Sequence, residues 1–165
     1  AQTPATERYY KDEEVKNIIS NTEKLSDQKA ADFDAVFYPG GHGPLWDLAY
    51  DKDSQQLILD FYNNDKPVAA VCHAPGVFKD IVLENGDPFV KGKNVTGFSN
   101  TEEEAVQLTE VVPFLVEDEL RNSGGQYSKT DDWGVHVVQD GLLITGQNPA
   151  SSEGVAEKLM TVLKK

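Results

Sequence analysis

An apolar run that ends at the only cysteine constrains the fold more than any other feature of this sequence. Residues 67–71 read PVAAV, and Cys72, His73 and the turn-forming residues 74–76 (APG) follow at once. A short run that is apolar on both faces is typical of a strand buried in a parallel sheet. We therefore predict that Cys72 stands at the carboxyl end of a central strand, in the strand–turn–helix connection that raises a nucleophile above the sheet.

This position predicts the chemistry of the cysteine. Backbone N–H groups and the positive end of a following helix favour the thiolate, which is the nucleophilic form, so we predict a reactive Cys72. The alternative is an inert cysteine packed in the core, the more common role of a lone cysteine. Adjacent His73 and the APG turn favour reactivity, because a core cysteine needs no sharp turn. His73 taken alone would more often be a structural histidine.

Predicted strands and helices alternate along the chain. Further strands are expected at residues 35–38, 94–96, 135–139 and 142–145, the last two as a hairpin around the DG pair at 140–141. Helices are expected near residues 14–19, 54–63, 102–104 and 116–122, and from Pro149 onward. Asn148 would cap that last helix, and its apolar face would contain Val155, Leu159, Val162 and Leu163. The alternation predicts one α/β domain, a three-layer sandwich with a mainly parallel, flavodoxin-like sheet.

A glycine-rich loop follows the strand expected at 35–38, where residues 38–47 read YPGGHGPLWD. Glycines allow backbone N–H groups to approach a substrate closely, as an oxyanion site requires. Neighbouring parallel strands end at the same edge of a sheet, so this loop and the Cys72 turn would meet there. We predict a substrate pocket formed by Gly41, His42, Gly43 and Trp46, although such a loop alone could be only a tight turn.

An acidic run offers a third component of the site, since residues 96–104 read TGFSNTEEE. A carboxylate here would orient His73 and stabilise its charged form, which completes a Cys–His–acid arrangement. The alternative is that acidic residues in a first helical turn offset the helix dipole. Glu102, Glu103 and Glu104 all stay open as the acid.

Composition excludes several functional classes. The chain has 28 acidic and 15 basic residues, and a net charge of −13 disfavours binding to nucleic acid or anionic membranes. It has neither an apolar run of membrane-spanning length nor the layout of a signal peptide at its start. A single cysteine suits the reducing cytoplasm. The histidines His42, His73 and His136 show no paired ligand spacing, so we expect no metal and no cofactor.

Four segments together resemble the ThiJ/PfpI superfamily, which is related in fold to class I glutamine amidotransferases. These are YPGGHG at 38–43, AAVCHAP at 69–75, VTGFS at 95–99 with the acids that follow, and LITGQNPAS at 143–151. The similarity runs from about Phe33 to the C-terminus and is greatest to the branch of glutathione-independent glyoxalases (glyoxalase III) and heat-shock chaperone-like proteins. It implies a nucleophile at Cys72, the adjacent His73 and an acid, for which Glu103 fits best. Backbone groups around Gly41, His42 and His73 would receive the oxyanion.

The resemblance also implies a function. We expect a cofactor-independent lyase of the D-lactate dehydratase type that converts methylglyoxal to lactate, with repair of early glycation adducts as a related activity. The alternatives are a stress-response holdase chaperone or cysteine redox sensor, and a cysteine peptidase or amidase. Many relatives form dimers, so we expect a homodimer.

The beginning of the chain departs from the family pattern. Residues 1–31 are polar and contain no strand pattern, whereas the family places two strands, and a glutamate that contacts the cysteine sulfur, ahead of the segment matching 32–165. We expect residues 1–165 to be a single, N-terminally incomplete domain, with a polar lead-in at 1–31 and a core at 32–165. The chain would then be a processed or partial copy, and the first strands would either come from a separate, still bound N-terminal fragment of the same protein or be missing from this copy.

Overall fold

The computed structural model describes residues 3–164 and has a mainly parallel sheet at its centre. The strands of this sheet, in spatial order, are β1 (Val36–Tyr38), β2 (Val68–Val71), β6 (Leu143–Gly146) and β5 (Val137–Asp140). β1, β2 and β6 run parallel, and β5 runs antiparallel to β6. A separate parallel pair is formed by β3 (Asn94–Val95) and β4 (Gln126–Tyr127). The prediction of an α/β fold with a mainly parallel sheet is confirmed.

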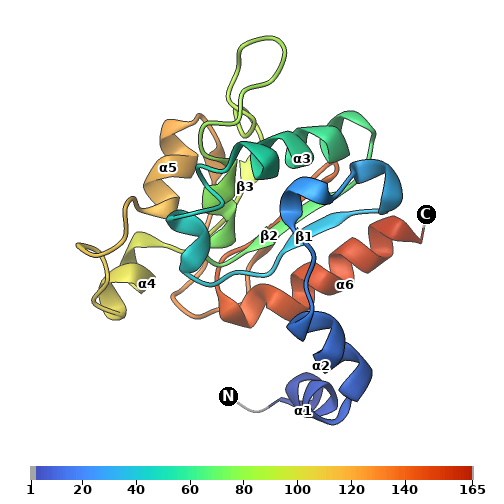
Figure 1. The fold of residues 1–165 in the computed structure, drawn as a ribbon. Helices are drawn as coiled ribbons and strands as arrows, with labels where there is room; N and C mark the ends of the chain where they lie inside the picture. Colours follow the sequence, from blue (N-terminus) through green and yellow to red (C-terminus); the bar gives the residue numbers. More distant parts are fainter. Residues whose placement is uncertain (1–2, 165) are drawn as a thin grey trace.

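Helices cover both faces of the sheet, which gives three layers (Figure 1). The α-helices are α1 (Pro4–Lys11), α2 (Glu13–Ser20), α3 (Lys52–Asn63), α4 (Asn100–Ala105), α5 (Val116–Asn122) and α6 (Ser152–Leu163). Successive residues of a strand point to opposite faces. Val68 and Ala70 accordingly lie in the large core with α3, and Ala69 and Val71 lie in a smaller core with α6. Full burial of these four residues explains why the sequence of β2 is apolar throughout.

Most expected elements are present, and the main error lies before the last helix. The hairpin forms as expected, with β5 and β6 on either side of Gly141. Asn148 does not cap α6, because a 3-10 turn (Pro149–Ser151) comes between them. The amide of Asn148 instead donates to Glu102 Oε1 at 2.8 Å. A tertiary contact has therefore displaced the local cap. Helix α1 and strand β4 were not expected from the sequence.

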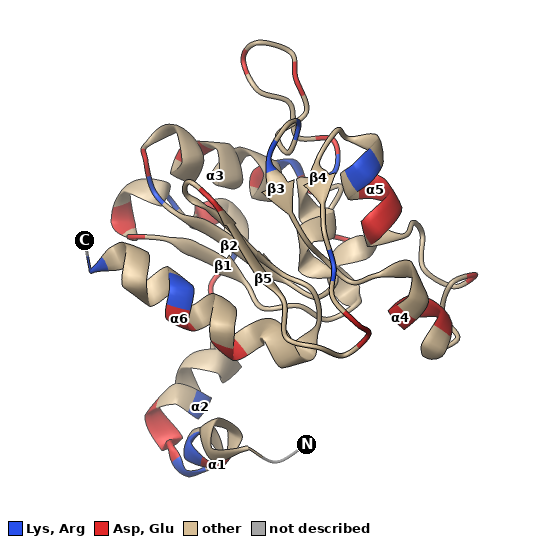
Figure 2. Ribbon diagram, turned by 180° about the vertical axis from the view of Figure 1, so that it is seen from behind, with Lys and Arg blue, Asp and Glu red and all other residues tan. Residues whose placement is uncertain are grey.

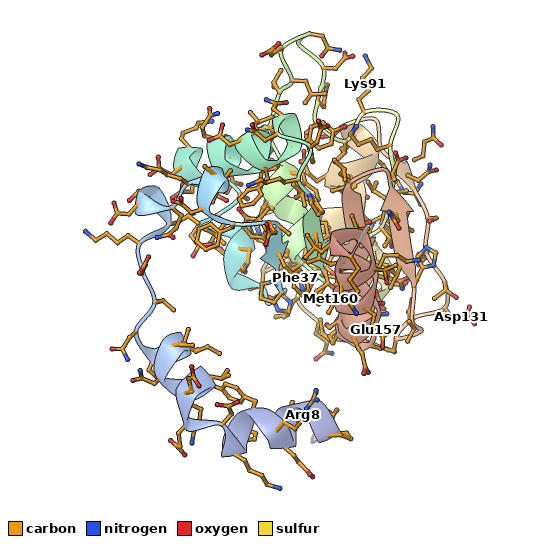
Figure 3. The ribbon with its side chains drawn as sticks, turned by 90° about the vertical axis from the view of Figure 1, so that its right-hand side faces the viewer. Arg8, Phe37, Lys91, Asp131, Glu157 and Met160 are labelled. Carbon is orange, nitrogen blue, oxygen red and sulfur yellow. The ribbon has the colours of Figure 1, made fainter. Side chains whose placement is uncertain are left out.

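The first two helices form an arm that projects from the body (Figures 1 and 3). Arg8 lies on this arm, well away from Phe37 and Met160 on the body (Figure 3). Neither helix contains a buried residue, and Ile18 and Ile19 on α2 are more than half exposed. Within residues 3–164, β1 lies at the edge of the sheet with β2 as its neighbour. The expected N-terminal incompleteness stays a prediction.

Acidic side chains are distributed over most of the surface helices, and basic ones are fewer (Figure 2). This agrees with the formal charge of −13. None of the helices in the described part of the chain is both long and apolar enough to cross a bilayer.

Candidate active site

Cys72 occupies a strained turn directly after β2. Its φ angle is +65°, in the left-handed region that non-glycine residues seldom adopt. The backbone holds this turn from two sides, because Cys72 N–H donates to the Gly146 carbonyl at 3.0 Å and Phe98 N–H donates to the Cys72 carbonyl at 2.8 Å. The helix that follows is a five-residue 3-10 helix (Ala74–Phe78). Strain of this kind is found mostly at functional sites, where the surrounding structure maintains it.

The glycine-rich loop after β1 lies against this turn. Backbone N–H groups of Gly41 and His73 hydrogen-bond to the Cys72 sulfur. Gly40 comes closest, since a Cβ atom added to it would lie 3.2 Å from Cys72 Cβ and 3.1 Å from the Val71 carbonyl oxygen. Gly43 begins the next 3-10 turn, and an added Cβ would meet no atom within 4 Å. Gly40 was missed by sequence reasoning, although its position after a strand was a usable signal.

Three of the candidate residues form a continuous line of contacts. Cys72 Sγ lies 3.3 Å from His73 Nδ1, and His73 Nε2 lies 2.7 Å from Glu103 Oε2. An ionised carboxylate only accepts hydrogen bonds, so Nε2 carries the proton in the neutral ring. Nδ1 is then an acceptor facing the cysteine. This arrangement allows His73 to take a proton from the Cys72 thiol.

The fold distinguishes the three neighbouring acids. Ser99 caps α4 and orients its first turn, and Glu102 and Glu103 are both buried. Glu103 contacts His73, whereas the Glu102 carboxylate accepts hydrogen bonds from Ser99 N and Oγ, Trp133 N, Gln147 Nε2 and Asn148 Nδ2. Glu104 is exposed. Glu103 is therefore the one of the three that contacts His73.

Burial opposes ionisation of both Cys72 and His73. It raises the pKa of Cys72 to about 11, outweighing the hydrogen bonds from the His73 and Gly41 backbone, and the charges of Glu102 and Glu103 raise this pKa further. Burial also lowers the pKa of His73, outweighing the opposing effect of Glu103. Both effects favour a thiol beside a neutral imidazole in the resting site. The expected thiolate stays a prediction that this burial opposes, because Cys72 is only 7 % exposed and its two backbone donors do not offset the desolvation.

Aromatic rings fix the orientation of His73. The centroids of the His42 and Phe98 rings lie 3.7 Å and 4.1 Å from that of His73. Trp133 packs edge-on against Phe98 at 5.8 Å. Trp46, expected in the pocket, is half exposed, and among the described residues it contributes no ring contact to this group. Trp133 is thus the tryptophan that packs into the aromatic group.

His42 has a partner that sequence reasoning did not predict. Its Nε2 lies 3.1 Å from Glu103 Oε1, so one carboxylate joins two imidazoles. The three side chains place their nitrogen and oxygen atoms within 4.8 Å of one another, close enough to share a metal ion. Each Nε2 already has a carboxylate oxygen as its partner. The fold therefore brings together two histidines that are 31 positions apart in the sequence.

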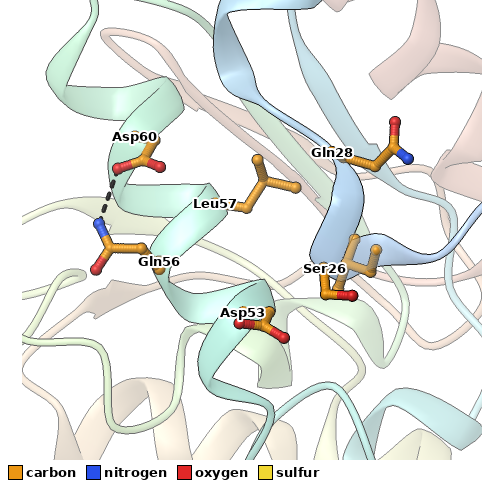
Figure 4. A pocket seen from close by; sticks show the side chains of 7 residues that line it. Ser26, Gln28, Asp53, Gln56, Leu57 and Asp60 are labelled. Carbon is orange, nitrogen blue, oxygen red and sulfur yellow. Dashed lines mark hydrogen bonds between the residues drawn. The ribbon is translucent and has the colours of Figure 1, made fainter.

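Two surface depressions lie away from these residues. The one in Figure 4 lies between the segment at Leu25–Gln28 and α3, and polar groups such as Asp53 and Asp60 line it. The other includes Pro67 and Leu142, at the amino-terminal edge of β2 and β6 and opposite to Cys72. Neither contains a histidine or cysteine, so neither is a candidate for the same chemistry.

Comparison with known proteins identifies related chains. The profile of the DJ-1/PfpI family matches residues 9–162. The chain is 31% identical over 160 residues to the glutathione-independent glyoxalase HSP31 of Saccharomyces cerevisiae, covering 93% of this chain and 68% of that protein. It is 30% identical over 152 residues to Glyoxalase 3 of Candida albicans, covering 88% of this chain. It spans only 64% of that relative's length.

Solved structures give the same relationship. Rapid Encystment Protein 24 kDa of Francisella tularensis superposes with a TM-score of 0.93 at 34% identity, covering 99% of this chain and 72% of that one. Glyoxalase III from Candida albicans superposes with a TM-score of 0.88 at 28% identity, covering 96% of this chain and 70% of that one. The fold of residues 3–164 is thus shared with these proteins almost throughout.

Proposed function

The chain belongs to the DJ-1/PfpI family, and on that premise we propose that it is a glutathione-independent glyoxalase that converts methylglyoxal to lactate. The observation that carries the proposal is the line of contacts from Cys72 Sγ through His73 to Glu103 Oε2. A soft sulfur nucleophile adds readily to an aldehyde, and an imidazole moves protons near neutral pH. The names of the yeast relatives support this substrate class.

The first step is the addition of Cys72 to the aldehyde carbon. His73 Nδ1 takes the thiol proton as the S–C bond forms, and it returns that proton to the carbonyl oxygen to give a hemithioacetal. The raised pKa of Cys72 makes this assistance necessary, because little thiolate is present beforehand. Glu103 holds the proton of Nε2 and stabilises the imidazolium that forms in between. The N–H groups of Gly41 and His73, which surround the sulfur, would also stabilise developing negative charge.

The remaining steps rearrange and release the product. His73 removes the proton from C1, the former aldehyde carbon, and delivers it to C2, the ketone carbon. The C1 hydroxyl proton passes to the C2 oxygen in the same rearrangement, which converts the hemithioacetal into a thioester of lactate. Water then adds to the thioester, the C–S bond breaks, and Cys72 regains its proton. C1 is oxidised and C2 is reduced within one molecule, so the reaction needs no external oxidant or cofactor. The balance is methylglyoxal plus water giving lactate and one proton, which is the outcome of a lyase of the D-lactate dehydratase type.

The decisive experiment measures lactate formed from methylglyoxal without glutathione, with chiral analysis of the product. Cys72→Ala should abolish the activity, and Cys72→Ser should reduce it severely. Retention of activity in Cys72→Ala would overturn the proposal. Thermal melting of both variants is the control for folding.

The other functions fit the site less well. A cysteine redox sensor needs an accessible thiolate, whereas Cys72 is buried and its pKa is raised. A peptidase needs room for a polypeptide beside a sulfur that is only 7 % exposed. Holdase activity does not depend on the sulfur, so it would survive in Cys72→Ala and is measured in the same samples.

The proposal also includes the oligomeric state of the protein, its location and a further polypeptide segment. A homodimer in the cytoplasm is expected, and analytical ultracentrifugation tests the dimer.

We also propose that a separate N-terminal segment of the same protein pairs with the outer edge of β1. An edge strand presents unpaired N–H and C=O groups that favour such pairing. Intact-mass and native mass spectrometry of material purified from its source would detect this second polypeptide or contradict it.

A further inference from the structure

Glu103 is the centre of a cluster that contains two imidazoles rather than one. Its Oε2 accepts from His73 Nε2 at 2.7 Å, and its Oε1 lies 3.1 Å from His42 Nε2. The two rings are also in contact, with centroids 3.7 Å apart and planes inclined by 35°. One carboxylate therefore serves two bases that lie within 4.8 Å of each other.

The two imidazoles differ in their access to water. The His73 and Glu103 side chains are 1 % and 2 % exposed, whereas the His42 side chain is 35 % exposed. Burial penalises a charged ring, and water solvates an exposed one. A single carboxylate balances one imidazolium, and two imidazolium rings in contact repel each other. A positive charge on buried His73 is therefore disfavoured, both by its burial and by the adjacent imidazole of His42.

We propose that His42 is a positioning residue that holds Glu103 and opposes a positive charge on the adjacent His73, leaving His73 free as the base. This inference rests on the proposed function, in which His73 must be neutral to receive the Cys72 proton. The charge on His42 acts on His73 by repulsion, and this repulsion contributes to the lowered pKa of His73. Glu102 acts in the opposite direction, from the same turn of α4 as Glu103.

The groups around the rings all belong to the network already described. Glu103 contacts both rings from α4, Cys72 faces His73 Nδ1 from the turn after β2, and Phe98 packs against His73 with ring centroids 4.1 Å apart. Lys and Arg side chains form none of the ion pairs of Glu103 in the described part of the chain. The charge of Glu103 is thus shared between the two imidazoles.

Two substitutions separate the hydrogen bond from the charge. His42→Gln keeps an amide donor near the position of Nε2 but cannot take a proton. His42→Phe keeps a flat ring over His73 but has neither donor nor charge. In both variants His73 should titrate about one pH unit higher than in the wild type, because the competing charge is gone. The acid limb of kcat for lactate formation should move upward by the same amount. The plateau of kcat should fall further in His42→Phe than in His42→Gln, and KM should change little in either variant.

The key measurement does not require activity. The chain has three histidines, so Cε1–Hε1 NMR signals can be assigned with single variants of His42 and His136. In the wild type we expect His73 to stay neutral to lower pH than in either His42 variant. An unchanged His73 titration in folded His42→Gln would overturn the inference. Absence of lactate formation in the wild type would overturn the proposed function alone. His42→Phe and thermal melting guard against misfolding of one variant.

Discussion

Glu102 and Glu103 are neighbours in the chain and both are buried, yet their carboxylates belong to separate hydrogen-bond networks. Glu103 joins the imidazoles of His42 and His73. Glu102 joins α4 to the Trp133 loop and to the segment after β6, through Gln147 and Asn148. The carboxylate of Glu103 therefore contacts the candidate catalytic histidine, whereas that of Glu102 has structural contacts that fix the helix on which both residues lie.

Glu103→Gln tests the acid. An amide presents a donor as well as an acceptor to His73 Nε2, so it permits the other tautomer and no longer stabilises the imidazolium. We expect kcat for lactate formation to fall by about 10²- to 10⁴-fold with the fold retained. Exposed Glu104→Gln is the matched control and should behave like the wild type. Equal kinetics in the two variants would remove Glu103 from the mechanism.

Glu102→Gln tests the structural network. The carboxylate of Glu102 accepts five hydrogen bonds in a fully buried position, and a glutamine amide would direct N–H groups at some of these donors. We expect the free energy of unfolding to fall by about 2–4 kcal/mol. Urea denaturation measures this change, again with Glu104→Gln as the control. A loss below that of the control would show that the network is unimportant for stability.

The pH dependence of alkylation tests the state of the cysteine. Because burial raises the pKa of Cys72 from 9.0 to about 11, the thiol predominates below that pH and the thiolate fraction grows about tenfold per pH unit. The rate of iodoacetamide labelling should follow this slope up to about pH 11. Mass spectrometry measures the labelled fraction of Cys72 directly, since the chain has one cysteine. A rate already at its plateau near pH 7 would instead indicate a thiolate–imidazolium pair.

Gly40→Ala and Gly41→Ala form a matched pair. Both glycines have positive φ, at +106° and +83°, but only a Cβ at Gly40 would approach Cys72 and the Val71 carbonyl within 3.2 Å. We expect Gly40→Ala to displace the nucleophile, lower activity strongly and cost about 1–3 kcal/mol of stability. Gly41→Ala should cost about 1 kcal/mol, from backbone strain alone. Lactate assays and thermal melts on both variants compare them, and a milder effect at Gly40 would contradict the close approach.

Local patterns in the sequence predicted much of the fold and part of the site. The apolar run before Cys72 predicted β2, and the DG pair predicted the β5–β6 hairpin, because burial and turn geometry depend on neighbouring residues. The two loops at the same sheet edge were expected to meet because parallel strands share that edge. Glu102, Glu103 and Glu104 could not be told apart on local grounds.

What the sequence by itself determined was the order of strands and helices and the position of Cys72 and His73 in a turn after a buried strand. Only the tertiary structure decided which acid contacts His73, that His42 shares it, that Asn148 binds Glu102, and that Trp133 packs against Phe98. It also decided the burial of Cys72, which opposes the thiolate that local motifs predicted. The reason is physical: these properties depend on burial and on contacts between residues far apart in the chain, and neither is encoded in the spacing of a motif.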